Sequence, residues 1–386
     1  MQPVYLDYAA TTPMRPEVQE AMSPLLDSAF GNPSSLHRWG RTASAALEEA
    51  RHVAAATLGA KAGEILFTRG GTESDNLAVL GSCAALRARG HTPTVVITAV
   101  EHHAVHAAAE RLAERGEATL VKLAVSDDGR VDLDQLRESL GDAPAVVSTM
   151  WVNNETGSVL PVPEIAEIVR GGGSVMHTDA VQAFGTLPVD VTEAPVDLLT
   201  VTGHKIYGPK GTGLLFVREG VELSPLLHGG GQERALRPGT EDVAGAVGLA
   251  CAMHLAASER DASAQRLGAL RDRLESGVLE ALPTTRINGG AGPRAPHISS
   301  LGVEGVDGAA LLSALDVEGV AASGGSACAS GAGGGSHVIS ALYGENDARA
   351  TVRLSLGRHT SEADLDQAIT TLTVVVTRLR ALQAVS

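Results

Sequence analysis

The spacing of hydrophobic positions changes repeatedly along this chain. From about residue 42, stretches with helical periodicity alternate with short runs of β-branched and other apolar residues. Runs that are apolar on both faces predict strands of a mostly parallel sheet, with helices covering both sides. The predicted strands are residues 64–68, 94–98, 119–125, 145–150, 175–178, 198–201 and 214–217. The pattern therefore predicts an α/β fold built in layers.

The pattern changes near residue 258. An uncharged apolar helix is predicted over 243–257 and a separate, charged helix over 260–282, with shorter strands and helices after Pro283. A chain of 386 residues is long enough for two or three globular units, at about 150 residues for each. We therefore expect a domain boundary near residue 258.

Charge and aromatic content narrow the classes of ligand. The chain has 30 Lys and Arg against 45 Asp and Glu, a net charge of −15. This charge opposes broad attraction to nucleic acid or to an anionic membrane surface. Aromatic residues make up 3% of the chain, which is too few for a platform that stacks nucleic-acid bases. We expect a small-molecule site and no direct binding of nucleic acid.

Two uncharged stretches raise the question of a membrane span. Residues 243–258 are apolar but number only 16, whereas a span needs about 20. Residues 319–344 contain eight glycines and five serines, a composition typical of a loop. The N-terminal residues show no basic segment followed by an apolar stretch, as a secretory signal would. We therefore expect a cytoplasmic protein with no membrane contact.

The three cysteines are widely separated and form no CxxC pair, which argues against a disulfide framework or a zinc ribbon. Cys83 and Cys251 lie in Ala- and Leu-rich helical stretches, where a cysteine usually serves packing. Cys328 lies instead within the glycine- and serine-rich stretch. A thiol in such a loop is placed to reach and attack a target.

Chemistry in an open parallel sheet is expected where strands end. After the strand 64–68, Gly70 and Gly71 are followed by Thr72 at the predicted start of a helix. Backbone N–H groups at such a junction can bind a phosphate, although Thr72 could also be a plain helix cap. The chain has no complete Walker or GxGxxG motif, so a dinucleotide site is disfavoured.

A pair of histidines occupies the next junction. His102 and His106 are four residues apart, a spacing that places both on one face of a helix and could ligate zinc. No third ligand is evident, and histidines at helix starts are often polar caps, so we expect no metal site. One of these rings could instead stack on a flat cofactor.

Two further strand ends carry an acid and a base. Asp179 ends the strand 175–178, with Gln182 following, and could hold a protonated ring nitrogen or merely cap a turn. Lys205 follows the strand 198–201 and could form a Schiff base, although an isolated loop lysine is usually solvated. A phosphate junction, an acid and a lysine in this order on one sheet together indicate pyridoxal phosphate.

With these residues in view, the sequence resembles the pyridoxal-phosphate cysteine desulfurases of the NifS and IscS type. The resemblance runs from Tyr5 to the C-terminal helix. The motifs that carry it are YLDYAATTP (5–13), GNPSS (31–35), VNNETG (152–157), GHKIYGPKG (203–211) and GSAC (325–328). It implies the type I fold of pyridoxal-phosphate transferases: a large domain with a mostly parallel seven-stranded sheet, and a smaller α/β domain. The implied domains are 15–258 for the large one, and 1–14 with 259–386 for the small one.

The resemblance also implies roles for the cofactor ligands. Lys205 would hold the cofactor covalently, His102 would stack on its ring and move protons, and Asp179 would pair with the ring nitrogen. Gln182 and Asn154 would hydrogen-bond the ring's phenolic oxygen. The phosphate ligands would be Gly71, Thr72, Thr202 and His204, joined by Thr240 from a partner subunit.

The remaining implied roles concern substrate and product. Arg353 would bind the substrate carboxylate, with Asn154 beside it, and Cys328 would take sulfur from L-cysteine as a persulfide, leaving L-alanine. The implied partners are a second copy of the chain and a sulfur-acceptor protein. The acceptor could serve iron–sulfur cluster assembly, tRNA thiolation, a thiocofactor or DNA phosphorothioation, among which the residues do not choose. A selenocysteine lyase or another enzyme of the same family, and a sulfur-carrier scaffold without chemistry, are the alternatives.

Overall fold

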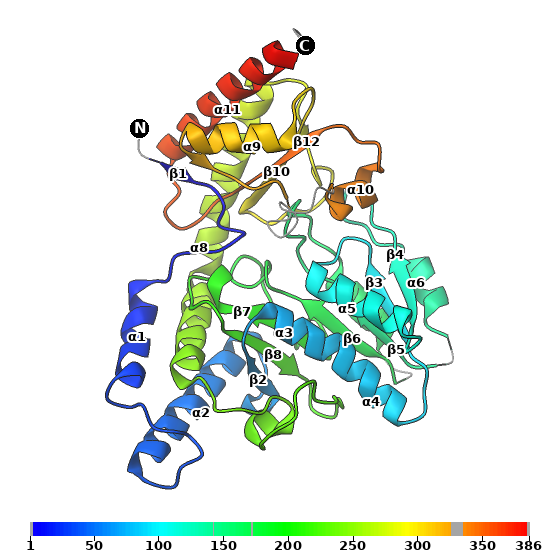
Figure 1. The fold of residues 1–386 in the computed structure, drawn as a ribbon, viewed down its shortest axis with the longest axis vertical. Helices are drawn as coiled ribbons and strands as arrows, with labels where there is room; N and C mark the ends of the chain where they lie inside the picture. Colours follow the sequence, from blue (N-terminus) through cyan, green and yellow to red (C-terminus); the bar gives the residue numbers. More distant parts are fainter. Residues whose placement is uncertain (1–2, 142, 171–172, 326–334, 384–386) are drawn as a thin grey trace.

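The computed structural model describes residues 3–383 except 142, 171–172 and 326–334. Its largest feature is a seven-stranded sheet in the order β2-β8-β7-β6-β5-β3-β4 (Figure 1). Strand β8 runs antiparallel to both of its neighbours, and the other strands run parallel. The strands, in sheet order, are Ile65–Thr68, Gly213–Val217, Leu198–Thr202, Val175–Asp179, Ala145–Ser148, Thr94–Thr98 and Thr119–Leu123. The predicted fold class is confirmed.

Helices bury both faces of this sheet. In β3, Val96 packs into one hydrophobic core while Val95 and Ile97 pack into another, as the two-residue repeat of a strand requires. The first core includes residues of helix α2, and the second includes residues of helix α5. The helices preceding residue 243 are α1 (Pro16–Leu26), α2 (Arg38–Leu58), α3 (Gly71–Asn76), α4 (Ser82–Ala88), α5 (His103–Glu114), α6 (Leu133–Ser139) and α7 (Val162–Val169). A π-helical turn, Leu77–Gly81, joins α3 to α4.

A separate hydrophobic core, the smaller core, lies at the other end of the molecule from α2, whose residues belong to the larger core (Figure 1). It gathers residues from both ends of the chain, because β1 (Val4–Tyr5) pairs in parallel with β11 (Val320–Ala321). An antiparallel sheet of β9 (Arg286–Ile287), β10 (Ile298–Val303) and β12 (Ala350–Ser355) lies beside it. The helices in this part of the sequence are α9 (Gly308–Val317), α10 (His337–Tyr343) and α11 (Glu362–Gln383).

A single helix connects the two cores. Helix α8 runs without interruption from Val243 to Ala281, so the prediction of two helices separated near residue 258 is wrong. The intervening Ala-Ala-Ser-Glu-Arg-Asp-Ala segment has no glycine or proline, and nothing in it ends a helix. The change of composition instead marks a change of partner, since Met253 belongs to the larger core and Leu267 to the smaller. The exact division of the chain into domains stays a prediction.

Three short 3-10 turns complete the described secondary structure: Ala62–Glu64, Gly203–Lys205 and Gln232–Ala235. None of the helices in the described part of the chain combines the length and apolarity that a membrane span requires.

Candidate active site

The sequence-predicted residues meet at one cavity of about 270 Å³. It opens where β6 and β7 end, next to the start of α3 and close to Arg353 of β12. The predicted residues that line it are Gly71, Thr72, His102, Asn154, Asp179, Gln182, Thr202, His204, Lys205 and Arg353. Residues not predicted from the sequence also line it: Ala9, Ala10, Asp75, Met150 and Val181.

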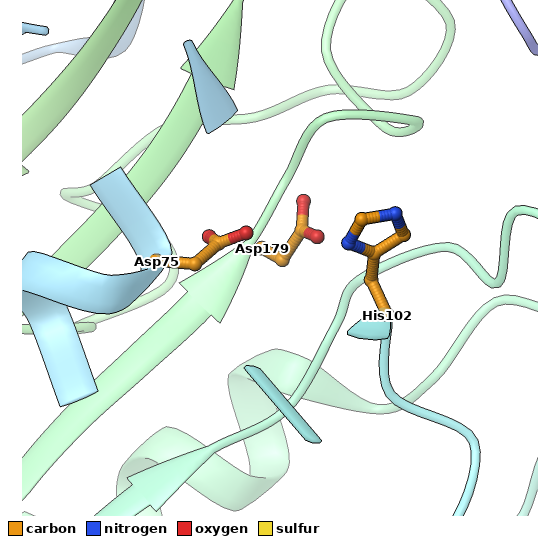
Figure 2. A group of neighbouring side chains, drawn as sticks. All are labelled: Asp75, His102 and Asp179. Carbon is orange, nitrogen blue, oxygen red and sulfur yellow. The ribbon is translucent and has the colours of Figure 1, made fainter. Parts of the chain in front are cut away.

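Asp75, Asp179 and His102 face one another in this cavity (Figure 2). One ligand atom of each lies within 4.8 Å of one ligand atom of the other two. Such a set of two carboxylates and an imidazole could also coordinate a cation. Sequence reasoning missed Asp75 because it is the fifth residue of α3, beyond the strand-to-helix junction, and reaches the site only through the direction of that helix.

The carboxyl groups of Asp75 and Asp179 are both buried in this cavity. Burial raises the pKa of Asp179, and the N–H of Val181 and the charge of Lys205 partly oppose that rise. Burial, together with repulsion from Asp179, raises the pKa of Asp75 well above its ordinary value. Asp179 also accepts a hydrogen bond of 2.9 Å from the backbone of Val181, so it does stabilise the turn that follows β6. A cationic group placed between these carboxyl groups would be strongly favoured.

His102 begins helix α5 and has a structural role as well as a place in the cavity. Its Nδ1 accepts a hydrogen bond of 3.2 Å from the backbone N–H of Ala104, which makes it the N-terminal cap. Burial, assisted by the charge of Lys205, lowers its pKa to about 4. The ring is therefore neutral at neutral pH. By contrast, Thr72 does not cap α3, because the capping position is Gly70.

The N-terminal segment closes one side of the cavity over Lys205. The Lys205 ammonium donates hydrogen bonds to the backbone oxygens of Ala9, at 2.5 Å, and Ala10, at 2.8 Å. The amide nitrogen of Gln182 donates to the same Ala9 oxygen at 2.9 Å. The oxygen of Gln182 lies 3.3 Å from Nε2 of the buried His297. Lys205 is thereby directed from the end of β7 towards the cavity.

The predicted phosphate ligands Gly71, Thr202 and His204 line the same cavity. A Cβ atom added at Gly71 would lie 3.3 Å from the side chain of Val181, so the backbone here is closely packed. The hydroxyl of Thr202 donates to the Thr212 oxygen at 2.9 Å, and His204 Nδ1 lies 3.2 Å from the Thr11 hydroxyl. Burial lowers the pKa of His204 to about 4.

Arg353 brings a buried guanidinium to the cavity from β12. Its Nη2 pairs with Asp7 at 2.8 Å, and its Nη1 donates to the Asn154 oxygen at 2.8 Å. Its Nε is buried and has no hydrogen-bond partner among the described residues. A guanidinium that is 2% exposed and held at two corners is preorganised to bind a carboxylate.

One predicted residue that the structure describes is not brought into this cavity. Thr240 is exposed and does not line it. Cys328 lies outside the described residues. Of the other cysteines, Cys83 is buried in a helix, where burial raises its pKa to about 12, and Cys251 is partly buried.

Comparisons with known proteins agree with this arrangement. The family model described as aminotransferase class V matches residues 4–368. The chain belongs to the class-V aminotransferase family. It is 43% identical to the cysteine desulfurase IscS of Dictyoglomus turgidum, over 98% of this chain and 95% of that protein.

Solved structures of NifS-like and related proteins are also similar to this chain. One described as a NifS-like protein superposes with a TM-score of 0.90 and 32% identity, covering 98% of this chain and 100% of its own. Another, described as SspA in complex with cysteine, gives a TM-score of 0.78 and 33% identity, over 92% and 98% of the two chains. The likeness to NifS- and IscS-like proteins therefore extends over nearly the whole chain.

Proposed function

We propose that this protein is a pyridoxal-phosphate-dependent cysteine desulfurase. The observation that carries the proposal is the cavity that joins Lys205 and Asp179 to the buried guanidinium of Arg353. Relatives that share 43% of their residues with this chain across almost its full length are named cysteine desulfurases. Class-V aminotransferases use pyridoxal phosphate, and the cavity has the groups that such a cofactor requires.

The donor set fits the cofactor at five points. Lys205 would bind it covalently, and the buried carboxyl groups of Asp179 and Asp75 would favour a protonated ring nitrogen. Gly71, Thr72, Thr202 and His204 would hold the phosphate, with Thr240 contributed by a second subunit. The cavity offers Asn154 and Gln182 for the remaining polar atom of the ring, and His102 for its face.

When bound, pyridoxal phosphate supplies an electron sink that makes the Cα proton of an amino acid acidic. Arg353 would hold the carboxylate of L-cysteine, assisted by Asn154, and so fix the orientation of that Cα. Lys205, once released from the cofactor, would take the Cα proton at its Nζ. The neutral ring of His102 is in the state required to accept a proton and pass it on.

Sulfur transfer would involve Cys328. Its thiolate would attack the substrate sulfur, so that a sulfur–sulfur bond forms while the carbon–sulfur bond breaks. The bonding electrons would stay with the carbon skeleton, which takes up a proton and leaves as L-alanine. The persulfide on Cys328 would then pass its outer sulfur to an acceptor protein, whose identity the cavity does not specify.

The test is a measurement of products from L-cysteine by the purified protein. We expect bound cofactor with visible absorbance. When a thiol reductant is present, we expect equal amounts of L-alanine and of sulfide released from the Cys328 persulfide. Cys328→Ala should abolish both products and leave the bound cofactor in place. Cys83→Ala and Cys251→Ala are the matched controls and should retain activity. Sulfide release by Cys328→Ala at the normal rate would contradict the persulfide step.

A second measurement separates the related activities. Turnover of L-cysteine should exceed that of L-selenocysteine and of cysteine sulfinate. A preference for selenocysteine would assign the protein to the lyase alternative. Absence of bound pyridoxal phosphate would overturn the enzymatic proposal as a whole.

A further inference from the structure

Glu155 contacts both described ends of the segment that contains Cys328. Residue Gly325 directly precedes the undescribed residues 326–334, and Ser336 follows them after one glycine. The Ser336 hydroxyl donates a hydrogen bond of 2.5 Å to Oε2 of Glu155. At Gly325, an added Cβ would lie only 2.6 Å from the same Oε2. One carboxylate oxygen therefore lies against both ends.

The backbone at Gly325 is adapted to this contact. Its φ of +104° lies in the region that glycine adopts far more readily than other residues. A side chain at this position would be strained and would also collide with the Glu155 carboxylate. The absence of a side chain allows the chain to pass directly beside the carboxylate.

The two ends belong to different packing regions. Before the segment, Ser323 exchanges backbone hydrogen bonds with Arg353, at 3.1 and 2.6 Å, beside the smaller core. After the segment, Val338 of α10 packs into the larger core. His337 Nε2 also lies 2.9 Å from the backbone oxygen of Glu101, the residue that precedes His102. Glu155 therefore contacts two parts of the chain, Gly325 and Ser336, whose neighbouring residues are anchored in different regions of the molecule.

Glu155 is itself fixed next to the proposed substrate site. Its backbone N–H donates to Asn153 Oδ1 at 2.9 Å, and the preceding residue, Asn154, accepts from Arg353 through its backbone oxygen. Burial raises the pKa of Glu155, whereas the Ser336 hydrogen bond and the charges of Arg353 and His103 oppose that rise. A group held this tightly can transmit position from the Arg353 region to both ends of the segment.

We propose that Glu155 is a positioning residue, which fixes both ends of the Cys328 segment relative to Arg353 and thereby sets how fast Cys328 captures sulfur. This inference rests on the proposed desulfurase activity. It requires no contact of Glu155 with substrate or cofactor. Glu155 is not among the residues that line the cavity, which agrees with a role that involves no contact with substrate or cofactor.

The experiment compares three variants in single-turnover reactions of the cofactor-loaded enzyme with L-cysteine. Glu155→Ala should slow persulfide formation on Cys328 by at least tenfold, while resting cofactor absorbance and the KM for L-cysteine change less than twofold. Glu155→Gln keeps an acceptor oxygen for Ser336 and should stay within threefold of wild type. Glu164→Ala, a change at an exposed glutamate of α7, is the control and should match wild type.

A second pairwise test isolates the contact itself. Ser336→Ala removes the hydroxyl but also the cap of α10, because Ser336 Oγ accepts from Ile339 N–H. Ser336→Thr keeps both bonds and should restore the rate. The double variant Glu155→Ala/Ser336→Ala should lose less than the sum of the two single losses, since both changes break one shared interaction and only the loss of the cap is separate. Additive losses would overturn the proposal.

Hydrogen exchange provides a readout that does not depend on the reaction. Amides of Gly325 and Ser336 should exchange faster in Glu155→Ala than in wild type or Glu155→Gln, with the rest of the chain unchanged. Unchanged exchange together with a normal persulfide rate would overturn the positioning role. If wild type formed no persulfide while exchange responded as expected, the proposed function would fail and the structural anchoring would stand.

Discussion

At the residue scale, the cavity is defined by charged groups that the fold buries at some cost. Arg353 is held by Asp7 and the Asn154 oxygen, while its Nε has no partner among the described residues. Asp75, Asp179 and Glu101 bury three carboxyl groups nearby, and burial is the main cause of the raised pKa of each. Buried charge of this kind is costly to stability and is common at functional sites.

Arg353 offers the most direct test of substrate binding. A lysine at this position would keep a positive charge for Asp7 but lose the planar fork that binds a carboxylate through two hydrogen bonds. We expect Arg353→Lys to raise the KM for L-cysteine about tenfold, the equivalent of one charge-assisted hydrogen bond of about 1.4 kcal/mol. Steady-state kinetics would measure this change. A large fall in kcat with an unchanged KM would show that the residue does not bind the substrate.

The burial of Glu101 leads us to predict that the free energy of unfolding depends on pH. Burial raises its pKa to about 8, from an ordinary value of 4.5, despite hydrogen bonds from Thr98 and Met150. A raised pKa means that its stabilising contribution is present below pH 4.5 and is lost as pH rises towards 8. The difference in melting temperature between Glu101→Gln and wild type should therefore shift in favour of the variant from pH 5 to pH 9. A constant difference would contradict the assignment.

At the element scale, helix α8 joins the two cores and carries a change of composition without a break. Its first half packs against α1 and α2, and its second half packs against α11. The apolar and charged stretches of the sequence are two parts of one helix that lie in different environments. Periodicity reports which face of a helix is buried, but it does not report whether two adjacent helical stretches are continuous.

A proline in the middle of α8 tests this continuity. Ser258→Pro should cost about 3 kcal/mol of stability, because proline removes a backbone hydrogen bond and collides with the preceding turn. Ser258→Ala is the control, since Ser258 is exposed and its hydroxyl bonds only within its own helix, to Leu255. Thermal or urea unfolding would give the two values. Equal stability of the two variants would indicate that the helix is interrupted at this point.

At the scale of the whole molecule, one proposed ligand lies away from the cavity. Thr240 is exposed, whereas the other proposed phosphate ligands line the cavity. We propose that a second copy of the chain contributes its Thr240, so that each site of a homodimer is built from two subunits. The partner subunit could then also cover the exposed apolar side chains of Phe30, Leu36 and Trp39.

Subunit mixing tests this arrangement. In a dimer of two Thr240→Ala chains, cofactor binding should be weakened at both sites. In a dimer of two Lys205→Ala chains, both sites should be inactive. A mixed dimer would contain one site with an intact Lys205 and the Thr240 of the other subunit. Each mixed dimer should have half of the wild-type activity, so an equal mixture, in which about half of the dimers are mixed, should regain about a quarter of it. No recovery after verified subunit exchange would place Thr240 within its own site or outside the reaction.

The sequence alone predicted the α/β class, all seven strands of the main sheet to within two residues at either end, and ten residues that line one cavity. Local periodicity determines strands and helices, and the topology of a parallel sheet indicated the strand-end junctions that contain Gly71, His102, Asp179 and Lys205. Asn154, Arg353 and the role of each ligand came from the resemblance to a known family. Strands β4 and β5 were each predicted two residues too long at their C-terminal ends, because apolar residues such as Val125 and Met150 follow the last residues of these strands.

Only the tertiary structure decided the contacts between distant parts of the chain. Asp75 in the cavity, Asp7 on Arg353, Ala9 over Lys205, and Glu155 against Gly325 and Ser336 each join residues far apart in the sequence. Periodicity has no information on such pairs, because it describes which face of an element is buried and not what covers it. The physical reason is that long-range contacts depend on how the two cores pack around one continuous helix.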